Sequence, residues 1–326
     1  MNIAVIGLGS MGKRRIRLLK KYFPDYNIYG IEGDKSRAEE CGKEFEISCF
    51  DNIKNAVDTV ALDCAFVCTP PLTHSTIITL CLNNGMHIFT ELNLVKDGYE
   101  INMQLAKEKG KILFLSSTAL YRKEMNYINS KVKNHKKKLS YSYHVGQYLP
   151  DWHPWENYKK SFFSEERTNG CREILAIELP WILRAFGKVS DISVVSARLT
   201  DLEIEFDDYF NIQIRHENGC IGNVIVDVVC REAVRKFEVV GESLYLEWRG
   251  TPDTLIEKDM ETKSIVSINL YDEIDRMEGY SSTIIENQYL DELKTFFSVL
   301  ENGVSGEYGF DEDWYTLEII DKIEGK

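Results

Sequence analysis

The sequence predicts an α/β fold in which a doubly wound parallel sheet precedes a second, α+β domain. Three observations predict this: strands and helices alternate over the first 120 residues, a glycine-rich turn follows the first strand, and strands predominate in the second half. The 326 residues suffice for two domains, which we expect at 1–120 and 121–326.

The first domain is expected to consist of βαβ units. Helices between strands carry the chain back to the same edge of a sheet, so the strands become parallel. In the helix at 10–23, Met11, Ile16, Leu19 and Phe23 are predicted to face the core, with basic residues opposite. The predicted strands are 2–7, 27–31, 64–69, 86–90 and 111–116, and the helices between them include 10–23, 73–84 and 99–110.

The second domain is predicted to carry a large, open, mainly antiparallel sheet. An apolar helix at 171–187 comes before a hairpin that turns at Asn218-Gly219, a dipeptide typical of two-residue β-turns. Further strands are expected within 236–248 and 264–271. Two closing helices, at 283–303 and 311–324, could pack on either domain.

Composition excludes several classes of function. Lys and Arg total 39 against 52 for Asp and Glu, and a net charge of -13 disfavours nucleic acid as a partner. No run of about 18 apolar residues is present, so we expect no membrane segment. The eight cysteines are scattered without a CxxC pair, which indicates reduced thiols in a cytoplasmic protein and no metal site.

The strongest motif is Gly7-Leu8-Gly9-Ser10-Met11-Gly12, which follows a strand and opens a helix. Gly7 permits the tight turn, Gly9 lets a pyrophosphate approach the backbone, and Gly12 allows close packing. Glu32 lies 20 residues after Gly12, where a carboxylate can accept both ribose hydroxyls of NAD. NADP stays open, because nearby residues could contact a 2'-phosphate: Lys13, Arg14, Lys35, Ser36 and Arg37.

A second motif lies at 66–77, where a strand ends at Thr69 and Pro70 and Pro71 forbid its continuation. Ligands bind at the carboxyl ends of strands in doubly wound sheets. The segment is therefore either part of a cofactor site or a plain strand-to-helix turn.

These segments, together with 83–94, resemble in order and spacing the glucose-fructose oxidoreductase, inositol dehydrogenase and MocA family. The resemblance implies a Rossmann domain, a substrate-binding domain, and NAD(P)-dependent oxidation or reduction of sugars, cyclitols or sugar nucleotides, commonly in an oligomer. We expect a homo-oligomer, dimer or tetramer. The implied cofactor contacts fall on Gly7 to Gly12, Glu32, Thr69, Pro70, His74 and Glu91.

The sequence differs from the family in two motifs, and the first of them helps to move the proton of the substrate hydroxyl. The family's Glu-Lys-Pro motif, whose lysine helps to move the hydroxyl proton, reads Glu91, Leu92, Asn93 here. The family's Asp-x-x-x-His pair is reduced to Glu173, which can stand for the aspartate and contact substrate, and Ile177.

Other residues are candidates for the missing function. Glu178, inside an apolar helix opened by Pro180, is either catalytic or paired with Arg172 or Arg184. In the loop 143–158, His153 could serve as acid or base.

The same loop offers aromatic faces for a sugar ring, although a rigid lid packed on the sheet is the alternative. Tyr121 and Arg122 could meet substrate past the strand at 111–116, or Arg122 could be an ordinary surface charge. The substrate candidates of the loop are Tyr148, Trp152 and Trp155.

We therefore predict an NAD(P)-dependent oxidoreductase for a sugar-like substrate, with a non-standard proton-transfer residue. The alternative is a catalytically silent protein that binds dinucleotide or sugar as a sensor or partner subunit. Losing a proton-transfer group costs typically 10² to 10⁴ in rate, a loss that a silent protein would tolerate.

Overall fold

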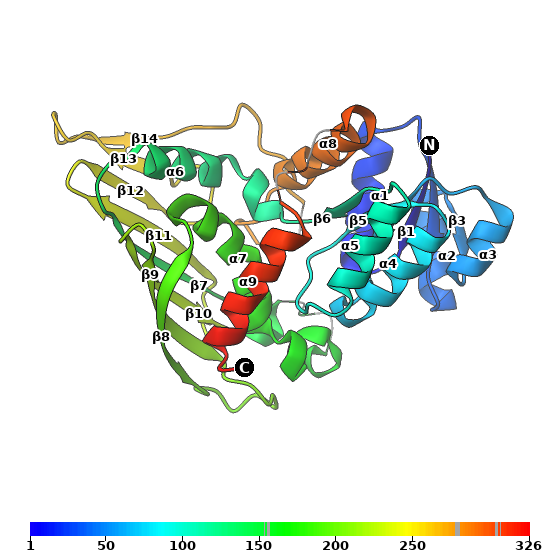
Figure 1. Cartoon of the computed structure of the whole chain (residues 1–326), viewed down its shortest axis with the longest axis horizontal. Helices are drawn as coiled ribbons and strands as arrows, with labels where there is room; N and C mark the ends of the chain where they lie inside the picture. The colour runs from blue at the N-terminus through cyan, green and yellow to red at the C-terminus, as the bar shows by residue number, and fades with distance from the viewer. Residues whose placement is uncertain (153, 155–156, 278–280, 304–305, 307) are drawn as a thin grey trace. The chain divides into compact units, whose positions relative to one another are not determined.

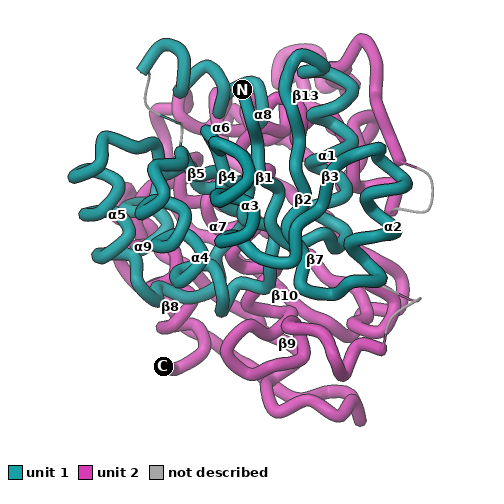
Figure 2. The backbone as a smooth tube through the Cα atoms, turned by 90° about the vertical axis from the view of Figure 1, so that its right-hand side faces the viewer, with its two compact units in different colours: residues 1–117, 292–314 teal, residues 118–291, 315–326 magenta. Residues whose placement is uncertain are grey.

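The computed structural model describes residues 1–152, 154, 157–277, 281–303, 306 and 308–326, which form two compact units. Unit 1 comprises residues 1–117 and 292–314, and unit 2 comprises residues 118–291 and 315–326; Figure 2 colours them separately. The chain passes between the units three times, so the C-terminal segment contributes to both.

Unit 1 is built on a parallel sheet of six strands in the order β3-β2-β1-β4-β5-β6. Figure 1 shows α4 and α5 side by side over one face of it. The strands are β1 (Asn2–Ile6), β2 (Asn27–Ile31), β3 (Ser48–Phe50), β4 (Cys64–Val67), β5 (His87–Thr90) and β6 (Leu113–Leu115). The helices are α1 (Ser10–Tyr22), α2 (Lys35–Phe45), α3 (Ile53–Thr59), α4 (His74–Asn83) and α5 (Tyr99–Glu108).

The order of strands reverses between β1 and β4, which is the topological switch point where doubly wound sheets bind ligands. Phenylalanines fill the core beside it: Phe66 and Phe89 stack with ring centroids 4.7 Å apart, and Phe296 meets both edge-on. Phe296 belongs to α8 (Asn287–Asn302), so a C-terminal helix completes the core of unit 1.

Unit 2 is built on an eight-stranded sheet in the order β14-β13-β12-β11-β7-β10-β9-β8. All neighbours are antiparallel except β7 and β10. The strands are β7 (Ser140–Gly146), β8 (Val189–Ala197), β9 (Tyr209–His216), β10 (Ile221–Asp227), β11 (Val234–Gly241), β12 (Leu244–Trp248), β13 (Ile256–Lys258) and β14 (Ile265–Ser267). The helices are α6 (Lys123–Asn134), α7 (Gly170–Phe186), the start of α8 and part of α9 (Phe310–Ile323).

Aromatic side chains join α7 to one face of this sheet. Trp181 and Phe186 of α7 pack against Tyr143, Tyr141 and Phe237, with centroid distances of 4.1 to 5.4 Å. The fold class predicted from the sequence is thus confirmed, including the hairpin, in which Gly219 has a φ of 83°. Short 3-10 helices lie at Pro71–Thr73, Thr118–Tyr121, Leu149–Asp151, Tyr158–Lys160, Phe162–Ser164 and Glu166–Thr168.

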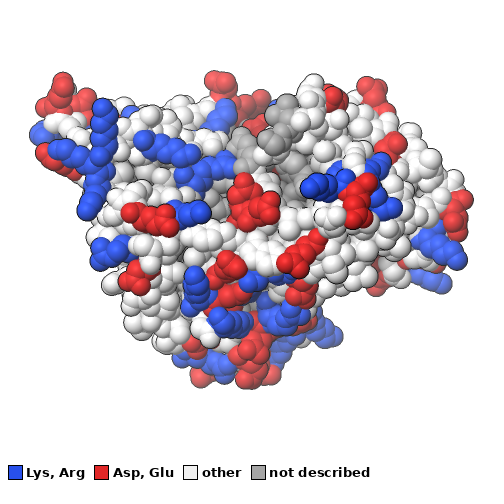
Figure 3. All heavy atoms as spheres, viewed as in Figure 1, with Lys and Arg blue, Asp and Glu red and all other residues white. Residues whose placement is uncertain are grey.

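Figure 3 shows acidic and basic side chains interspersed over the face in view. None of the helices formed by the described residues combines the length and apolarity that a membrane crossing needs. Within the ranges given above, His, Cys and carboxylate side chains do not gather in groups of three or more that could hold a metal ion.

Candidate functional site

The glycine turn joins β1 to α1 and has the geometry that its sequence predicts. Gly7 has a φ of 87°, and a Cβ there would lie 2.9 Å from the carbonyl oxygen of Cys68. A Cβ on Gly12 would lie 2.0 Å from the carbonyl oxygen of Gly7, so only glycine fits. A Cβ on Gly9, by contrast, meets no described atom within 4 Å. Gly9 is the N-cap of α1, so the room above it is available to an anion at the helix N-terminus.

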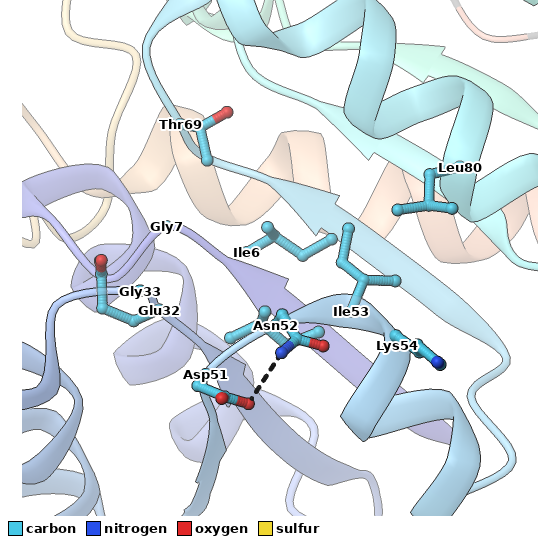
Figure 4. A pocket seen from close by; sticks show the side chains of 11 residues that line it. Ile6, Gly7, Glu32, Gly33, Asp51, Asn52, Ile53, Lys54, Thr69 and Leu80 are labelled. Carbon is cyan, nitrogen blue, oxygen red and sulfur yellow. Dashed lines mark hydrogen bonds between the residues drawn. The ribbon is translucent and has the colours of Figure 1, made fainter.

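A pocket of about 580 Å³ opens at the carboxyl ends of β1 to β4. Figure 4 shows Glu32 beside Gly7 and Gly33, with Thr69 and Ile53 on other parts of its wall. The pocket spans the glycine turn and the end of β2, which is where dinucleotide-binding folds of this topology generally hold the nucleoside half of the ligand.

Glu32 is held in place by backbone donors. One carboxylate oxygen accepts the N–H of Leu8 at 3.0 Å and the other accepts the N–H of Asp34 at 3.0 Å. Arg37, an exposed residue, contacts the same carboxylate at 3.3 Å. Lys13, a candidate phosphate partner in the sequence, is instead engaged by Glu40 and Glu44 at 2.8 Å each.

His74 connects the second motif to the third. Its Nε2 lies 2.7 Å from the carbonyl oxygen of Thr69, and its Nδ1 lies 2.7 Å from Oδ1 of Asn93. Burial lowers the pKa of His74, which favours the neutral ring. The ring therefore holds the Thr69-Pro70 turn in position, and Asn93, where the family has proline, provides its second partner.

Glu91 lies at the end of β5 and forms a buried cluster with Arg15 of α1 and Glu292 of α8. The Arg15 guanidinium donates to Glu91 at 2.5 and 3.1 Å and to Glu292 at 2.7 Å. Glu292 also accepts from the Ser116 hydroxyl and the Ser117 N–H.

The expectation that the basic residues of α1 lie opposite its core face was wrong for Arg14 and Arg15, which are buried. A fully buried guanidinium is tolerated here because two carboxylates and a hydroxyl surround it. Leu92, at the position of the family's lysine, is half-buried and brings no proton donor.

In unit 2, Glu178 accepts three hydrogen bonds. Its donors are the Tyr143 hydroxyl at 2.8 Å, Trp181 Nε1 at 2.7 Å and the Arg235 guanidinium at 2.7 Å. The expected pairing with Arg172 or Arg184 is corrected to Arg235, because β11 brings that residue to α7; Arg172 pairs with Asp321 and Glu324. Arg235, which the sequence analysis missed, keeps 22% of its side chain exposed.

Glu173 differs from Glu178. Its Oε2 is buried without a hydrogen-bond partner among the described residues, and burial raises its pKa to about 7. A carboxyl group with such a pKa can both give and take a proton near neutrality.

Arg122 has a structural environment and does not support the substrate role expected for it. It is buried, donates to Glu124 at 2.8 Å and to the carbonyl oxygens of Thr283 and Gly250, and stacks over Trp248. Its neighbour Tyr121 is also buried.

Residues 143–146 of the expected loop 143–158 belong instead to strand β7, and the other described residues of this segment pack within unit 2. Trp152 Nε1 donates to the carbonyl oxygen of Gln147, and its ring contacts Phe163 with centroids 5.3 Å apart. The guanidinium of Arg231 lies 4.0 Å over the Tyr148 ring. His153 and Trp155 lie outside the described residues.

Residues 1–117 match the family model described as "Oxidoreductase family, NAD-binding Rossmann fold" (GFO_IDH_MocA). The N-terminal domain belongs to the Gfo/Idh/MocA oxidoreductase family. The chain is also 25% identical over 132 residues to human biliverdin reductase A. That match spans 40% of this chain and 44% of the human protein.

Solved structures share the fold over nearly the whole chain. A levoglucosan dehydrogenase crystallised with NADH and levoglucosan has a TM-score of 0.79 and 16% identity, covering 100% of this chain and 96% of that one. Biliverdin reductase from Synechocystis sp. PCC 6803, crystallised with biliverdin and NADP⁺, has a TM-score of 0.78 and 16% identity, covering 99% and 97%. This likeness shows a shared fold over nearly the whole chain, and the match of residues 1–117 confirms the family that the sequence predicts.

Proposed function

We propose that this protein is an NAD-dependent oxidoreductase that transfers hydride between the nicotinamide and a hydroxyl or ketone carbon of a sugar, cyclitol or nucleotide-sugar-like substrate. The observation that carries the proposal is the preformed dinucleotide turn, with Glu32 fixed at its edge, in a domain of this oxidoreductase family. When bound, the nicotinamide supplies the hydride chemistry. The chain supplies binding, orientation and proton transfer.

NAD is expected rather than NADP because the carboxylate of Glu32, at the end of β2, would repel a 2'-phosphate. The backbone of Leu8 and Asp34 orients the carboxylate, which can accept the ribose hydroxyls. Arg37 could serve a phosphate only by leaving this carboxylate, and Lys13 is neutralised by two glutamates.

Glu173 is the candidate that the structure favours for acid and base work. Its unpartnered oxygen and its pKa of about 7 suit proton exchange with a substrate hydroxyl. Glu178, with three donors, is better suited to position Arg235, whose exposed part could contact substrate. His153 remains a second candidate for proton transfer, and Tyr148, Trp152 and Trp155 remain candidates for the sugar face.

We also propose a cytoplasmic homo-oligomer that forms through unit 2. The face of the eight-stranded sheet opposite α7 exposes apolar side chains, including Val195, Ile221 and Val240, whose exposed fractions are 70%, 45% and 39%. Covering such a face with a second copy would remove these side chains from water. Light scattering of the wild type and of a Val195→Lys variant tests this assembly.

The first experiment is a fluorescence titration with NADH and NADPH, in which excited tryptophan transfers energy to the bound nicotinamide. We expect NADH to bind more tightly than NADPH, and Glu32→Ala to weaken NADH binding at least tenfold. Glu39→Ala, an exposed glutamate on α2, is the matched control and should bind as the wild type does. Tighter binding of NADPH would contradict the NAD assignment.

The second experiment is a screen of polyols and sugar nucleotides for NADH formation, followed by Glu173→Gln. We expect the turnover number to fall at least a hundredfold. Glu165→Gln, an exposed glutamate before α7, should leave it unchanged. An unchanged turnover in Glu173→Gln would remove Glu173 from the mechanism.

A second candidate activity is reduction of an open-chain tetrapyrrole, because the human relative and one similar structure are biliverdin reductases. Biliverdin therefore belongs in the screen. The other alternative is a silent binding protein. It is favoured if NADH binds and no substrate class gives turnover, and redox turnover on any substrate would end it.

A further inference from the structure

We propose that the buried carboxyl group of Glu292, next to Glu91, holds a proton in the free protein and releases it when oxidised, but not reduced, nicotinamide dinucleotide binds. This inference deepens the proposed function and depends on it for the place of the nicotinamide. It assigns a role to Glu292, which comes from the C-terminal part of unit 1 and was not singled out in the sequence.

The two carboxylates are close together. Both contact the same nitrogen of Arg15, Glu91 at 3.1 Å and Glu292 at 2.7 Å, so the oxygens that contact it are no more than about 6 Å apart. The side chains of Arg15 and Glu292 have no exposed surface, and that of Glu91 is 11% exposed. Two like charges at such a distance in a buried site favour retention of a proton by one of them.

Among the contacts described for this pair, one cation faces two carboxylates. Arg15 from α1 is the cation that contacts both carboxylates. From the end of β4, Cys68 contributes a thiol whose pKa is well above its ordinary value, mainly because it is buried and then because Glu91 is near. From α4, His74 contributes a ring whose pKa is lowered by burial, and from the end of β6 come a hydroxyl and an N–H. With both carboxylates ionised, the cluster would carry a net negative charge.

The titration of Glu292 agrees with this count. Burial raises the pKa of Glu292 to about 7, Arg15 opposes the rise, and the nearby Glu91 adds to it. Near neutral pH, the Glu292 carboxyl group is therefore about half protonated. Its proton can leave through Glu91, which connects the cluster to solvent.

The link to the cofactor lies in the position of Glu91. It directly follows β5, next to β4, on the edge of the sheet where doubly wound folds bind their ligands. An oxidised nicotinamide ring carries a positive charge and a reduced ring carries none. A positive ring beside Glu91 would stabilise the doubly ionised pair, so binding of the oxidised form is coupled to loss of the proton.

The test is isothermal titration calorimetry of the whole protein with NAD⁺ and with NADH at pH 7, in two buffers of different ionisation enthalpy. The difference between buffers gives the number of protons released. We expect a substantial fraction of a proton per NAD⁺ and close to none per NADH, because part of the molecules hold the proton on Glu292 at this pH. The affinity for NAD⁺, but not for NADH, should rise severalfold between pH 6 and pH 8.

Glu292→Gln should bind NAD⁺ without releasing a proton and with little pH dependence. Glu301→Gln, an exposed glutamate on the same helix, should release as the wild type does. The comparison of NAD⁺ with NADH on the wild-type protein tests the inference by itself, even if the Glu292→Gln variant does not fold. NAD⁺ binding with no proton released, or with equal release for NADH, overturns the inference and leaves the proposed function intact. Failure of both dinucleotides to bind overturns the proposed function itself.

Discussion

Replacing Arg15 with methionine is expected to destabilise the protein strongly. Methionine has similar length and no charge, so the change leaves Glu91 and Glu292 buried beside each other without their cation. Arg15 also donates to Ser116 at 3.2 Å and lies 4.5 Å over the Phe89 ring, and these contacts are lost together. Removing one partner of a buried ion pair costs about 3 to 5 kcal/mol.

Urea unfolding followed by circular dichroism measures this loss. We expect the free energy of unfolding of Arg15→Met to fall by about 3 to 5 kcal/mol at pH 7.5. Lys137→Met is the matched control, because Lys137 pairs with Glu242 on the surface, where their exposed fractions are 60% and 73%. An exposed pair contributes at most about 1 kcal/mol.

The pH dependence of the variant separates charge from packing. At pH 5.5, part of the loss should be recovered, since carboxyl groups without a nearby cation take up protons and become neutral. A loss below about 1 kcal/mol at both pH values would refute the argument that Arg15 neutralises the cluster. A large loss that does not change with pH would assign the effect to packing instead.

Other predictions follow from single contacts. Gly9→Ala should fold normally but bind NADH at least tenfold more weakly. Gly12→Ala should be destabilised, because its Cβ would meet the Gly7 carbonyl. Thermal unfolding measures the loss of stability, and NADH titration measures the loss of binding. Glu292→Gln should flatten the pH dependence of urea unfolding. In the wild type, Glu292 has a pKa of about 7 when folded and about 4.5 when unfolded, so the unfolded protein gives up this proton more easily. The free energy of unfolding of the wild type should therefore fall by up to about 3 kcal/mol as pH rises from about 4.5 to 7. Glu178→Gln should lower the free energy of unfolding by about 3 kcal/mol, because Arg235 then lacks its counter-ion, and an unchanged value would contradict the pairing.

Local patterns sufficed for most of the fold. The strand-glycine-helix sequence at residues 2–23 and the turn at Asn218-Gly219 depend on neighbouring residues, so periodicity and glycine placement predict them. The short strand β3 was missed because three half-exposed or exposed residues carry no apolar run. Which strands are adjacent in the eight-stranded sheet depends on long-range pairing, including the parallel pair β7 and β10.

Site residues could be predicted where they lie within one segment of the sequence, but not where segments that are distant in the sequence come together in the fold. Glu32 was found by its spacing from the glycines, and its backbone donors now explain its orientation. Glu292 is 201 positions from Glu91 and gave no local signal. The sequence hinted at this cluster only through Arg15, a charged residue of an amphipathic helix. If the helix packs on the side of Arg15, the arginine needs a buried partner of opposite charge.

Arg15 replaces the positive charge of the family's lysine but not its role in proton transfer. Arg15 supplies a positive charge next to Glu91. Burial alone would lower the pKa of Arg15, but the carboxylates of Glu91 and Glu292 outweigh burial and raise the pKa above its ordinary value, so Arg15 cannot give up a proton. The cation can hold Glu91 in place and cannot replace a lysine as proton shuttle. A shuttle at neutral pH needs a group that titrates there, and Glu173 has that property. If a chain with Leu92 transfers hydride, positioning and proton exchange, which one lysine combines, must come from different groups, since Arg15 can hold Glu91 in place but cannot exchange a proton.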